Sequence, residues 1–244
     1  LEQTYSKNDA IDHINHLLKI ISSKIYITIH NKPLILIYRP DLIPDSKNYF
    51  KTWREEATKN GLEGLHIAGV QSGLVKLSNE QIIECGFDSV IDFQPNREYF
   101  PTFSSPKRVL IEFLRRILPN EVFQSIKNNA NTVNKIDYEK MFKIVKNSYS
   151  AKKDYTFFPT IFPSWDNTAR RKTPTIIEND NENLFYNWLH EAKVCIENRH
   201  DDEKIIFINA WNEWAEGCHL EPDKKNGRKF LKSIKSLVVN SKNI

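Results

Sequence analysis

Apolar, strand-like runs alternate with helical patterns along most of this chain, and this alternation restricts its fold more than any other feature. The apolar runs cover residues 34–38, 65–71, 87–93, 155–162 and 204–210. Helical patterns cover residues 8–21, 46–60, 79–84, 109–118, 138–145, 181–198 and 229–239. Strands that are apolar on both faces are typical of a parallel sheet covered by helices on both sides. The alternation therefore predicts an α/β fold.

The pattern contains about five βα units, which begin near Leu34, His66, Ser89, Thr156 and Ile205. A closed (β/α)8 barrel of the TIM type needs eight such units. The chain starts at Leu1 without an initiator Met or a signal-peptide pattern, so we expect it to be cut from a longer protein. We predict that residues 1–244 are a single domain, the C-terminal portion of a TIM barrel whose N-terminal strands are missing.

The alternative fold is a complete doubly wound sheet of five strands. Such a sheet commonly carries a Gly-x-Gly-x-x-Gly turn after a strand, where it binds a dinucleotide. No such turn follows any of the apolar runs, and the whole chain has only seven glycines. The barrel is therefore the preferred prediction.

Charge and composition exclude several classes of partner. The net charge of +4 is small against 35 basic and 31 acidic residues, and the basic residues are spread along the chain, which argues against nucleic-acid binding. No run approaches 18 consecutive apolar residues, so we predict no integral membrane segment. The three cysteines, Cys85, Cys195 and Cys218, are far apart and form no C-x-x-C pair. This usage favours a reducing compartment, the cytoplasm.

The densest chemistry lies directly after the last predicted strand, in the run Asn-Ala-Trp-Asn-Glu-Trp-Ala-Glu-Gly at residues 209–217. A βα barrel places its active site at these strand ends. Glu213 and Glu216 are three residues apart, which puts both carboxylates on the same side of one helical turn. Two carboxylates in different surroundings can divide acid and base duties, as cleavage of a glycosidic bond requires. We predict that Glu213 and Glu216 are catalytic.

The residues around the two glutamates suit a sugar substrate. Trp211 and Trp214 offer large apolar faces on which sugar rings can lie. Asn212 can both donate to and accept from sugar hydroxyls. The plain alternative is a solvated helix face with packed tryptophans. The buried strand before the motif and Gly217 directly after it favour the functional interpretation.

A second polar cluster follows the fourth predicted strand, at residues 163–171, and in a barrel it would share the same rim. Its candidate substrate-binding residues are Trp165, Asp166, Asn167, Arg170 and Arg171. They suit a polyol or an anion, and they equally suit a loop held by an Asx turn. The ends of the earlier strands add four weaker candidates, Tyr38, Arg39, Gln71 and Asp92.

The sequence predicts no metal and no cofactor. The run His200-Asp201-Asp202 resembles a metal-binding run, but it precedes a strand, so we interpret it as a solvated turn on the opposite face. His219 near Glu221 has no second histidine at a useful spacing. No P-loop and no Gly-x-Ser-x-Gly elbow is present.

Five segments together resemble the WbsX family, which is encoded in bacterial clusters for O-antigen and other surface polysaccharides and is commonly labelled glycosyltransferase. The segments are residues 36–40, 69–72, 165–171, 209–217 and 220–223, so the resemblance covers nearly the whole chain in order. The family is similar in turn to glycoside hydrolase family 99, the endo-α-mannosidases, which fold as (β/α)8 barrels. WbsX-like proteins carry further residues upstream, and these hold the first barrel strands.

The resemblance implies roles for the two glutamates. Glu213 would deprotonate a sugar 2-hydroxyl, which would attack the anomeric carbon and give a 1,2-anhydro sugar. Glu216 would act as acid to the leaving group and then as base to water or an acceptor. The chain departs from the hydrolases at Ala215, where His is usual, and at Cys218, where Thr is usual. One departure lies inside the motif and the other directly after it, and together they leave the identity of the sugar open.

The resemblance therefore implies a carbohydrate-active enzyme of surface-polysaccharide metabolism that acts on an oligo- or polysaccharide. One alternative is a nucleotide-sugar-dependent glycosyltransferase of lipopolysaccharide biosynthesis, for which only Arg170 and Arg171 are local candidates to bind a diphosphate. Another is a non-catalytic glycan-binding barrel. A cytoplasmic location, peripheral to the inner membrane through other polysaccharide-assembly enzymes, is compatible with the resemblance.

Overall fold

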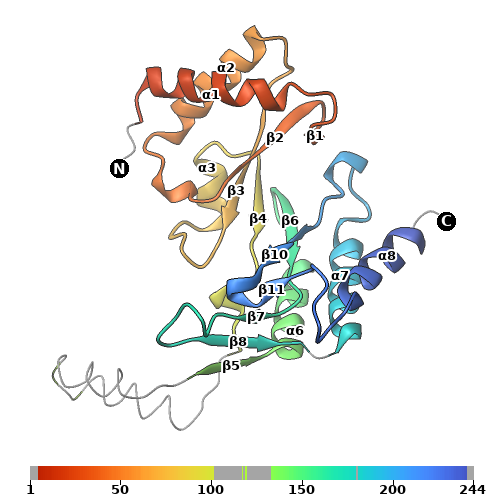
Figure 1. Ribbon diagram of the computed structural model, residues 1–244. Helices are drawn as coiled ribbons and strands as arrows, with labels where there is room; N and C mark the ends of the chain where they lie inside the picture. The colour runs from red at the N-terminus through yellow and green to blue at the C-terminus, as the bar shows by residue number, and fades with distance from the viewer. Residues whose placement is uncertain (1–4, 102–116, 118, 120–132, 180, 241–244) are drawn as a thin grey trace. The chain divides into compact units, whose positions relative to one another are not determined.

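The computed structural model describes residues 5–101, 117, 119, 133–179 and 181–240 (Figure 1). Contacts along the chain divide it into two compact units. The first unit is drawn from Leu1–Asn96, Ala151–Ile161 and Ala192–Phe207. The second is drawn from Arg97–Ser150, Phe162–Glu191 and Ile208–Ile244. The expectation that residues 1–244 form a single domain stays a prediction.

The first unit is built on a six-stranded sheet whose order is β1-β2-β3-β4-β6-β9. Its strands are β1 (Thr28–Ile29), β2 (Lys32–Ile37), β3 (His66–Gln71), β4 (Ser89–Asp92), β6 (Thr156–Ile161) and β9 (Phe207–Ile208). Strands β2, β3, β4 and β6 pair in parallel, and β1 pairs antiparallel with β2. The predicted parallel pairing is therefore confirmed for β2, β3, β4 and β6. The expected cover of helices on both faces is wrong for the described residues, since the cluster on the second face contains no helix residue.

Helices cover one face of this sheet. They are α1 (Lys7–Ile21), α2 (Ser46–Lys59) and α3 (Asn79–Glu84). Ile35, Ile67 and Val90 point to this face and join a buried cluster with Phe50 and Trp53 of α2. The helix starts follow from the sequence: the Ser6 side chain caps α1, and a capping box of Ser78 and Gln81 begins α3.

The alternate residues of the same strands form a second buried cluster on the other face. Leu34, Ala68, Ile91 and Phe158 belong to it, together with Ile29 from β1 at one edge of the sheet. Phe207 from β9, at the other edge, packs against the same cluster. Because both edge strands contribute to one core, the sheet is curled, as in half of a barrel. Within the described residues the sheet is open, so the full eight-stranded barrel stays a prediction.

The second unit contains two small sheets. In the first, β5 (Asn134–Asp137) pairs in parallel with β8 (Thr175–Glu178), and β7 (Trp165–Asp166) pairs antiparallel with β8. In the second, β10 (Asn212–Glu213) and β11 (Cys218–His219) form a hairpin. None of these strands was expected from the apolar runs.

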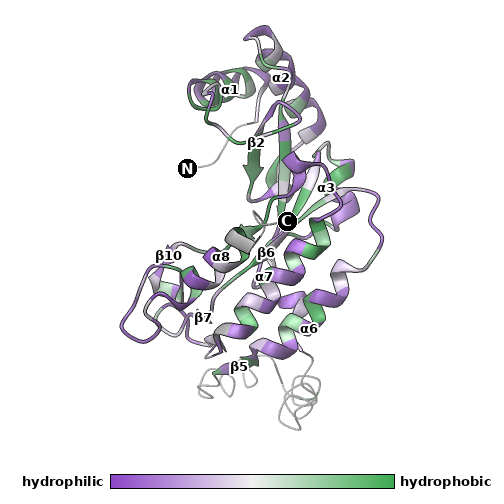
Figure 2. Cartoon of the chain, turned by 90° about the vertical axis from the view of Figure 1, so that its right-hand side faces the viewer, coloured by the Kyte–Doolittle hydropathy of each residue, from purple (hydrophilic) through white to green (hydrophobic). Residues whose placement is uncertain are grey.

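Helices α6 (Tyr138–Tyr149) and α8 (Lys229–Asn240) complete this unit, together with the part of α7 (Glu182–Ile196) that ends at Glu191. Figure 2 shows α6 and α7 with a hydrophobic and a hydrophilic side, as expected for helices that bury one face. Trp188 of α7 is fully buried against Tyr138, Phe142 and Phe162.

The short 3₁₀ helices of the two units are η1 (Pro40–Leu42), η2 (Arg97–Tyr99), η3 (Asp201–Glu203) and η4 (Trp214–Glu216).

The helix predicted for residues 109–118 falls outside the described residues, apart from 117. Among the described helices, none has the length and apolarity that a bilayer crossing requires.

Candidate functional site

The motif at residues 209–217 forms a hairpin with a tight turn at its tip. Glu213 is the last residue of β10 and the N-cap of η4, and Glu216 is the last residue of η4. Gly217 ends the turn in the left-handed conformation, with φ of 56°. A 3₁₀ helix has three residues per turn, so residues three apart lie above one another. The same-side arrangement expected for the two glutamates is thus produced by a 3₁₀ turn inside a hairpin.

The turn lies directly against the second polar cluster of the sequence. A Cβ atom added at Gly217 would stand 3.0 Å from the Cβ of Asp166 and 3.2 Å from its backbone nitrogen. The Ser164 hydroxyl donates a hydrogen bond to the Gly217 carbonyl oxygen at 2.7 Å. The segments 163–171 and 209–217 are therefore in contact within the second unit.

This close approach predicts a specific cost for Gly217→Ala. A side chain at a left-handed φ costs about 1–2 kcal/mol, and here the added methyl group also meets Asp166. Gly227→Ala is the matched control, because Gly227 has nearly the same φ of 55° and nothing within 4 Å of an added Cβ. Urea unfolding should show a larger loss of stability for Gly217→Ala than for Gly227→Ala. Equal losses would mean that the contact with Asp166 does not constrain the turn.

Arg170 connects the two carboxylates. Its Nη1 lies 3.2 Å from Oε1 of Glu216 and 3.6 Å from Oε1 of Glu213. The side chain of Glu216 is 18% exposed and that of Glu213 is 40% exposed. Burial raises the pKa of Glu216, and the Glu213 charge adds to this, while Arg170 and Arg171 oppose it. One guanidinium thus serves two carboxylates that differ in their exposure to water.

Trp214 is fixed by neighbours that were not predicted to belong to the site. Its ring stacks on His219, with ring centroids 3.7 Å apart, and its Nε1 donates to Glu221 at 2.6 Å. His219 Nε2 is in turn 2.9 Å from Asp223 Oδ2. Despite these contacts, Trp214 remains 51% exposed, so a large part of its apolar surface is open to solvent. Trp211 is 55% exposed, and Asn212 is exposed as well.

The signal that could have identified His219 and Asp223 is their spacing of four residues directly after the motif. Burial works against the ionised form of Asp223, but hydrogen bonds from the Asn226 backbone and side chain and from His219 outweigh it and lower its pKa to about 2. Asp223 is therefore a carboxylate at neutral pH. It holds His219 against the tryptophan ring.

Cys218, in strand β11 of the hairpin, has a buried side chain that contacts the segment before β10. It is completely buried, and its thiol donates to the Asn209 carbonyl oxygen at 2.9 Å. Burial raises the pKa of this thiol, so it stays protonated and is a poor nucleophile. The Asn209–Ala210 peptide bond is cis. Cys218, where the hydrolases usually have Thr, thus has a buried side chain that packs within the hairpin.

Hydrogen bonds within the loop after β6 agree with its interpretation as an Asx-turn loop, while its role in substrate binding stays a prediction. The Asp166 carboxylate accepts from the Thr168 backbone at 2.9 Å, which is an Asx turn, and the Asn167 side-chain oxygen accepts from the Thr175 backbone at 2.8 Å. These contacts shape the loop and leave Arg170 to reach the glutamates. A pocket of about 250 Å³ lies beside it and is lined in part by Trp165, Asp166, Glu178, His219, Asp223 and Lys225.

The remaining predicted residues belong to the first unit, at the ends of β2, β3 and β4. Tyr38 is 52% exposed and meets Phe93 edge to face. Arg39 is held locally by Asp41 through two hydrogen bonds of 2.9 and 3.0 Å. Gln71 and Asp92 are buried register partners. The carboxylate pair lies in the second unit, and the predicted residues that share this unit with it are Trp165, Asp166, Asn167, Arg170, Arg171, Trp211, Asn212 and Trp214.

The comparison with known proteins agrees with the motifs. Residues 1–234 match the family described as Glycosyltransferase WbsX. The WxcX proteins from two strains of Xanthomonas campestris pv. campestris are each 27% identical over 246 residues, which cover 100% of this chain and 32% of each relative. The chain thus spans about a third of the length of these curated relatives.

A solved structure shows the same fold. It is a glycoside hydrolase-like protein that matches with a TM-score of 0.57 at 17% identity, over 94% of this chain and 59% of that one. This likeness concerns the fold. The family match, in contrast, extends over nearly the whole sequence. The chain belongs to the WbsX glycosyltransferase family.

Proposed function

We propose that this chain is part of a carbohydrate-active enzyme that acts on glycosidic bonds of bacterial surface polysaccharides, with Glu213 as base and Glu216 as acid. The observation that carries the proposal is the asymmetry of the pair. Both carboxylates contact Arg170, but Glu216 is the more buried one and its pKa is raised. A protonated Glu216 beside an ionised Glu213 is the starting state that acid–base cleavage needs.

The proposed reaction has two balanced steps. Glu213 takes the proton of a sugar 2-hydroxyl while that oxygen attacks the anomeric carbon. The bond to the leaving oxygen breaks and Glu216 protonates it, which leaves a 1,2-anhydro sugar. Glu216 then takes a proton from water or an acceptor hydroxyl, whose oxygen attacks the anomeric carbon. The three-membered 1,2-anhydro ring opens, and its 2-oxygen takes back a proton from Glu213.

Arg170 fits this sequence of events. At each stage one glutamate is protonated and the other is ionised, so the pair carries one negative charge throughout. A single guanidinium 3.2 and 3.6 Å from the two carboxylates can balance that charge wherever it lies. The exposed faces of Trp214 and Trp211, together with Asn212, would bind the sugar ring and its hydroxyls. Trp165 and Asp166 would contribute from the adjacent pocket.

A nucleotide-sugar-dependent glycosyltransferase is the second candidate. It is favoured by the description of the family to which the chain belongs. The side chain of Arg170 is 51% exposed, and Arg171 is exposed beside it, so both can reach an anionic donor. In this case the bond that breaks is the one between the sugar and the nucleotide, and Glu213 and Glu216 would not act as base and acid on a glycosidic bond of a polysaccharide.

The test uses the protein encoded by the whole reading frame that contains this chain. It is incubated with the surface polysaccharide of its own strain, with and without nucleotide sugars, and the product masses are followed. We expect shortening or rearrangement of the glycan without any nucleotide. Growth by one sugar mass only when a nucleotide sugar is present would overturn the roles of Glu213 and Glu216 and favour the second candidate. Binding without any product would leave a glycan-binding barrel.

A further inference from the structure

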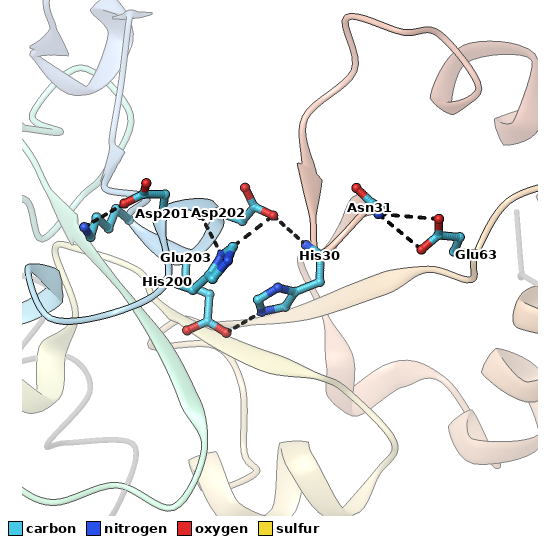
Figure 3. Close-up of polar contacts among 8 residues, drawn as sticks. His30, Asn31, Glu63, His200, Asp201, Asp202 and Glu203 are labelled. Carbon is cyan, nitrogen blue, oxygen red and sulfur yellow. Dashed lines mark hydrogen bonds and ion pairs between the residues drawn. The ribbon is translucent and has the colours of Figure 1, made fainter.

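Two segments far apart in the sequence bring histidines and carboxylates together in the first unit (Figure 3). One is the turn between β1 and β2, where His30 and Asn31 both have positive φ values, of 49° and 63°. The other is η3 with its N-cap, His200. Only seven of the 244 residues are histidines, and two of them meet here with their ring centroids 4.7 Å apart.

The potential ligand atoms already lie close together. One atom each from His30, His200 and Asp202 can be chosen so that all three are within 4.8 Å of one another. In a tetrahedral site with bonds of about 2.1 Å, ligand atoms are roughly 3.4 Å apart, so each side chain would need to move by about 1 Å. The side chains of His30, His200 and Asp202 are 49%, 61% and 40% exposed, so they have room to do this.

Hydrogen bonds orient the ligands before any ion is bound. His30 Nε2 lies 3.1 Å from Oε1 of Glu203, and the His30 backbone nitrogen donates to Oδ2 of Asp202 at 3.0 Å. Metal-bound histidines usually donate their second ring N–H to a carboxylate, which fixes the ring and keeps the other nitrogen free of a proton. Glu203 is placed to do this for His30. Figure 3 shows both contacts between the turn and η3.

The donor set selects the class of ion. Two imidazoles and one carboxylate suit zinc and its neighbours, whereas magnesium and calcium prefer oxygen ligands alone. With neutral imidazoles, Asp202 and Glu203 supply two negative charges, which a divalent ion would balance. The neighbouring cation Lys204 is paired with Asp201 at 2.8 Å.

We propose that His30, His200 and Asp202 bind one divalent transition-metal ion of the zinc type, with water as a further ligand and Glu203 as the residue that positions the His30 ring. The ion would join the turn that precedes β2 to the 3₁₀ helix that precedes β9. These segments flank strands near opposite edges of the curled sheet. The site would therefore hold the two edges of the sheet together at the N-terminal ends of its strands.

The test uses the 244-residue chain after treatment with a chelator. Zn²⁺ is titrated calorimetrically, and Co²⁺ is added separately as a spectroscopic probe. We expect one Zn²⁺ per chain, a rise in the melting temperature with Zn²⁺, and visible Co²⁺ bands of a tetrahedral site. His30→Gln, His200→Gln and Asp202→Asn should each weaken binding by more than about 100-fold, and Glu203→Gln by about 10–100-fold.

His16→Gln is the matched control, because His16 is an exposed histidine of α1 outside the cluster. It should bind Zn²⁺ as the unaltered chain does. Circular dichroism confirms that each variant is folded, as expected for exposed side chains. The proposal fails if the unaltered chain does not bind Zn²⁺, if His30→Gln and His200→Gln keep their affinity, or if Mg²⁺ or Ca²⁺ competes as well as Co²⁺.

Discussion

Glu216→Gln should lower turnover of a polysaccharide substrate by at least about 100-fold while glycan binding is retained. Glutamine keeps the size of the side chain and its contact with Arg170, but it cannot give a proton to the leaving oxygen or take one from water. Because Glu216 is the more buried carboxylate and its pKa is raised, it is the group expected to carry the proton at the start. Product masses give turnover, and calorimetry with the glycan gives binding.

Glu191→Gln is the control for this variant. Glu191 lies on α7 in the same unit, pairs with Lys146 at 2.6 Å and is outside the motif, so its loss should leave turnover unchanged. If Glu216→Gln turned over substrate at the original rate, the acid would have to be another group. If the variant lost binding together with turnover, the residue would be serving recognition.

Trp188→Ala should reduce the free energy of unfolding by about 3–5 kcal/mol. Trp188 has no exposed surface, stacks on Phe142, meets Tyr138 and Phe162 edge to face, and donates from Nε1 to the Tyr149 hydroxyl at 3.0 Å. Its removal leaves a cavity in the core of the second unit and deletes the hydrogen bond to Tyr149. Since typical domains are stable by only about 5–15 kcal/mol, this is a large fraction of the total.

Trp211→Ala provides the comparison for urea unfolding followed by circular dichroism. Trp211 is 55% exposed, so its loss should change stability by no more than about 0.5 kcal/mol. A small effect of Trp188→Ala, close to that of Trp211→Ala, would contradict the packing described for α6 and α7.

The long apolar strands and the capped helices could be predicted from the sequence because their signals are local. The helix at Asn79–Glu84 has the expected bounds, and β2, β3, β4 and β6 lie where the apolar runs placed them. The last strand was expected over residues 204–210 and is only Phe207–Ile208. Strands of two residues, such as β7 and β10, are too short to show a period. The pairing of β5 with β8 joins segments about forty residues apart and is set by tertiary contacts.

Of the candidate site, the sequence likewise predicts the parts that depend on local spacing. Glu213 and Glu216 are neighbours in the sequence, so their association needed only local geometry. The choice of Arg170 over Arg171 as their partner depends on how the loop at residues 163–171 folds back, and no spacing reports that. The His200 run was interpreted as a solvated turn because it precedes a strand. No sequence pattern points to its neighbour His30, which lies about 170 residues earlier in the chain. Their proximity depends on the curl of the sheet.

The division of the chain into two units has a consequence for how it is made. The chain passes repeatedly from one unit to the other, and the first unit is completed only by residues 192–207. During synthesis β2, β3 and β4 can pair with one another early, but β4 must wait for its second neighbour, β6. Until Phe158 of β6 and Phe207 of β9 are added, the nascent chain exposes the apolar face that carries Leu34, Ala68 and Ile91. No single cut could release either unit intact. A shortened chain that stops before β9 would lack one edge of the sheet and should depend on chaperones to remain in solution.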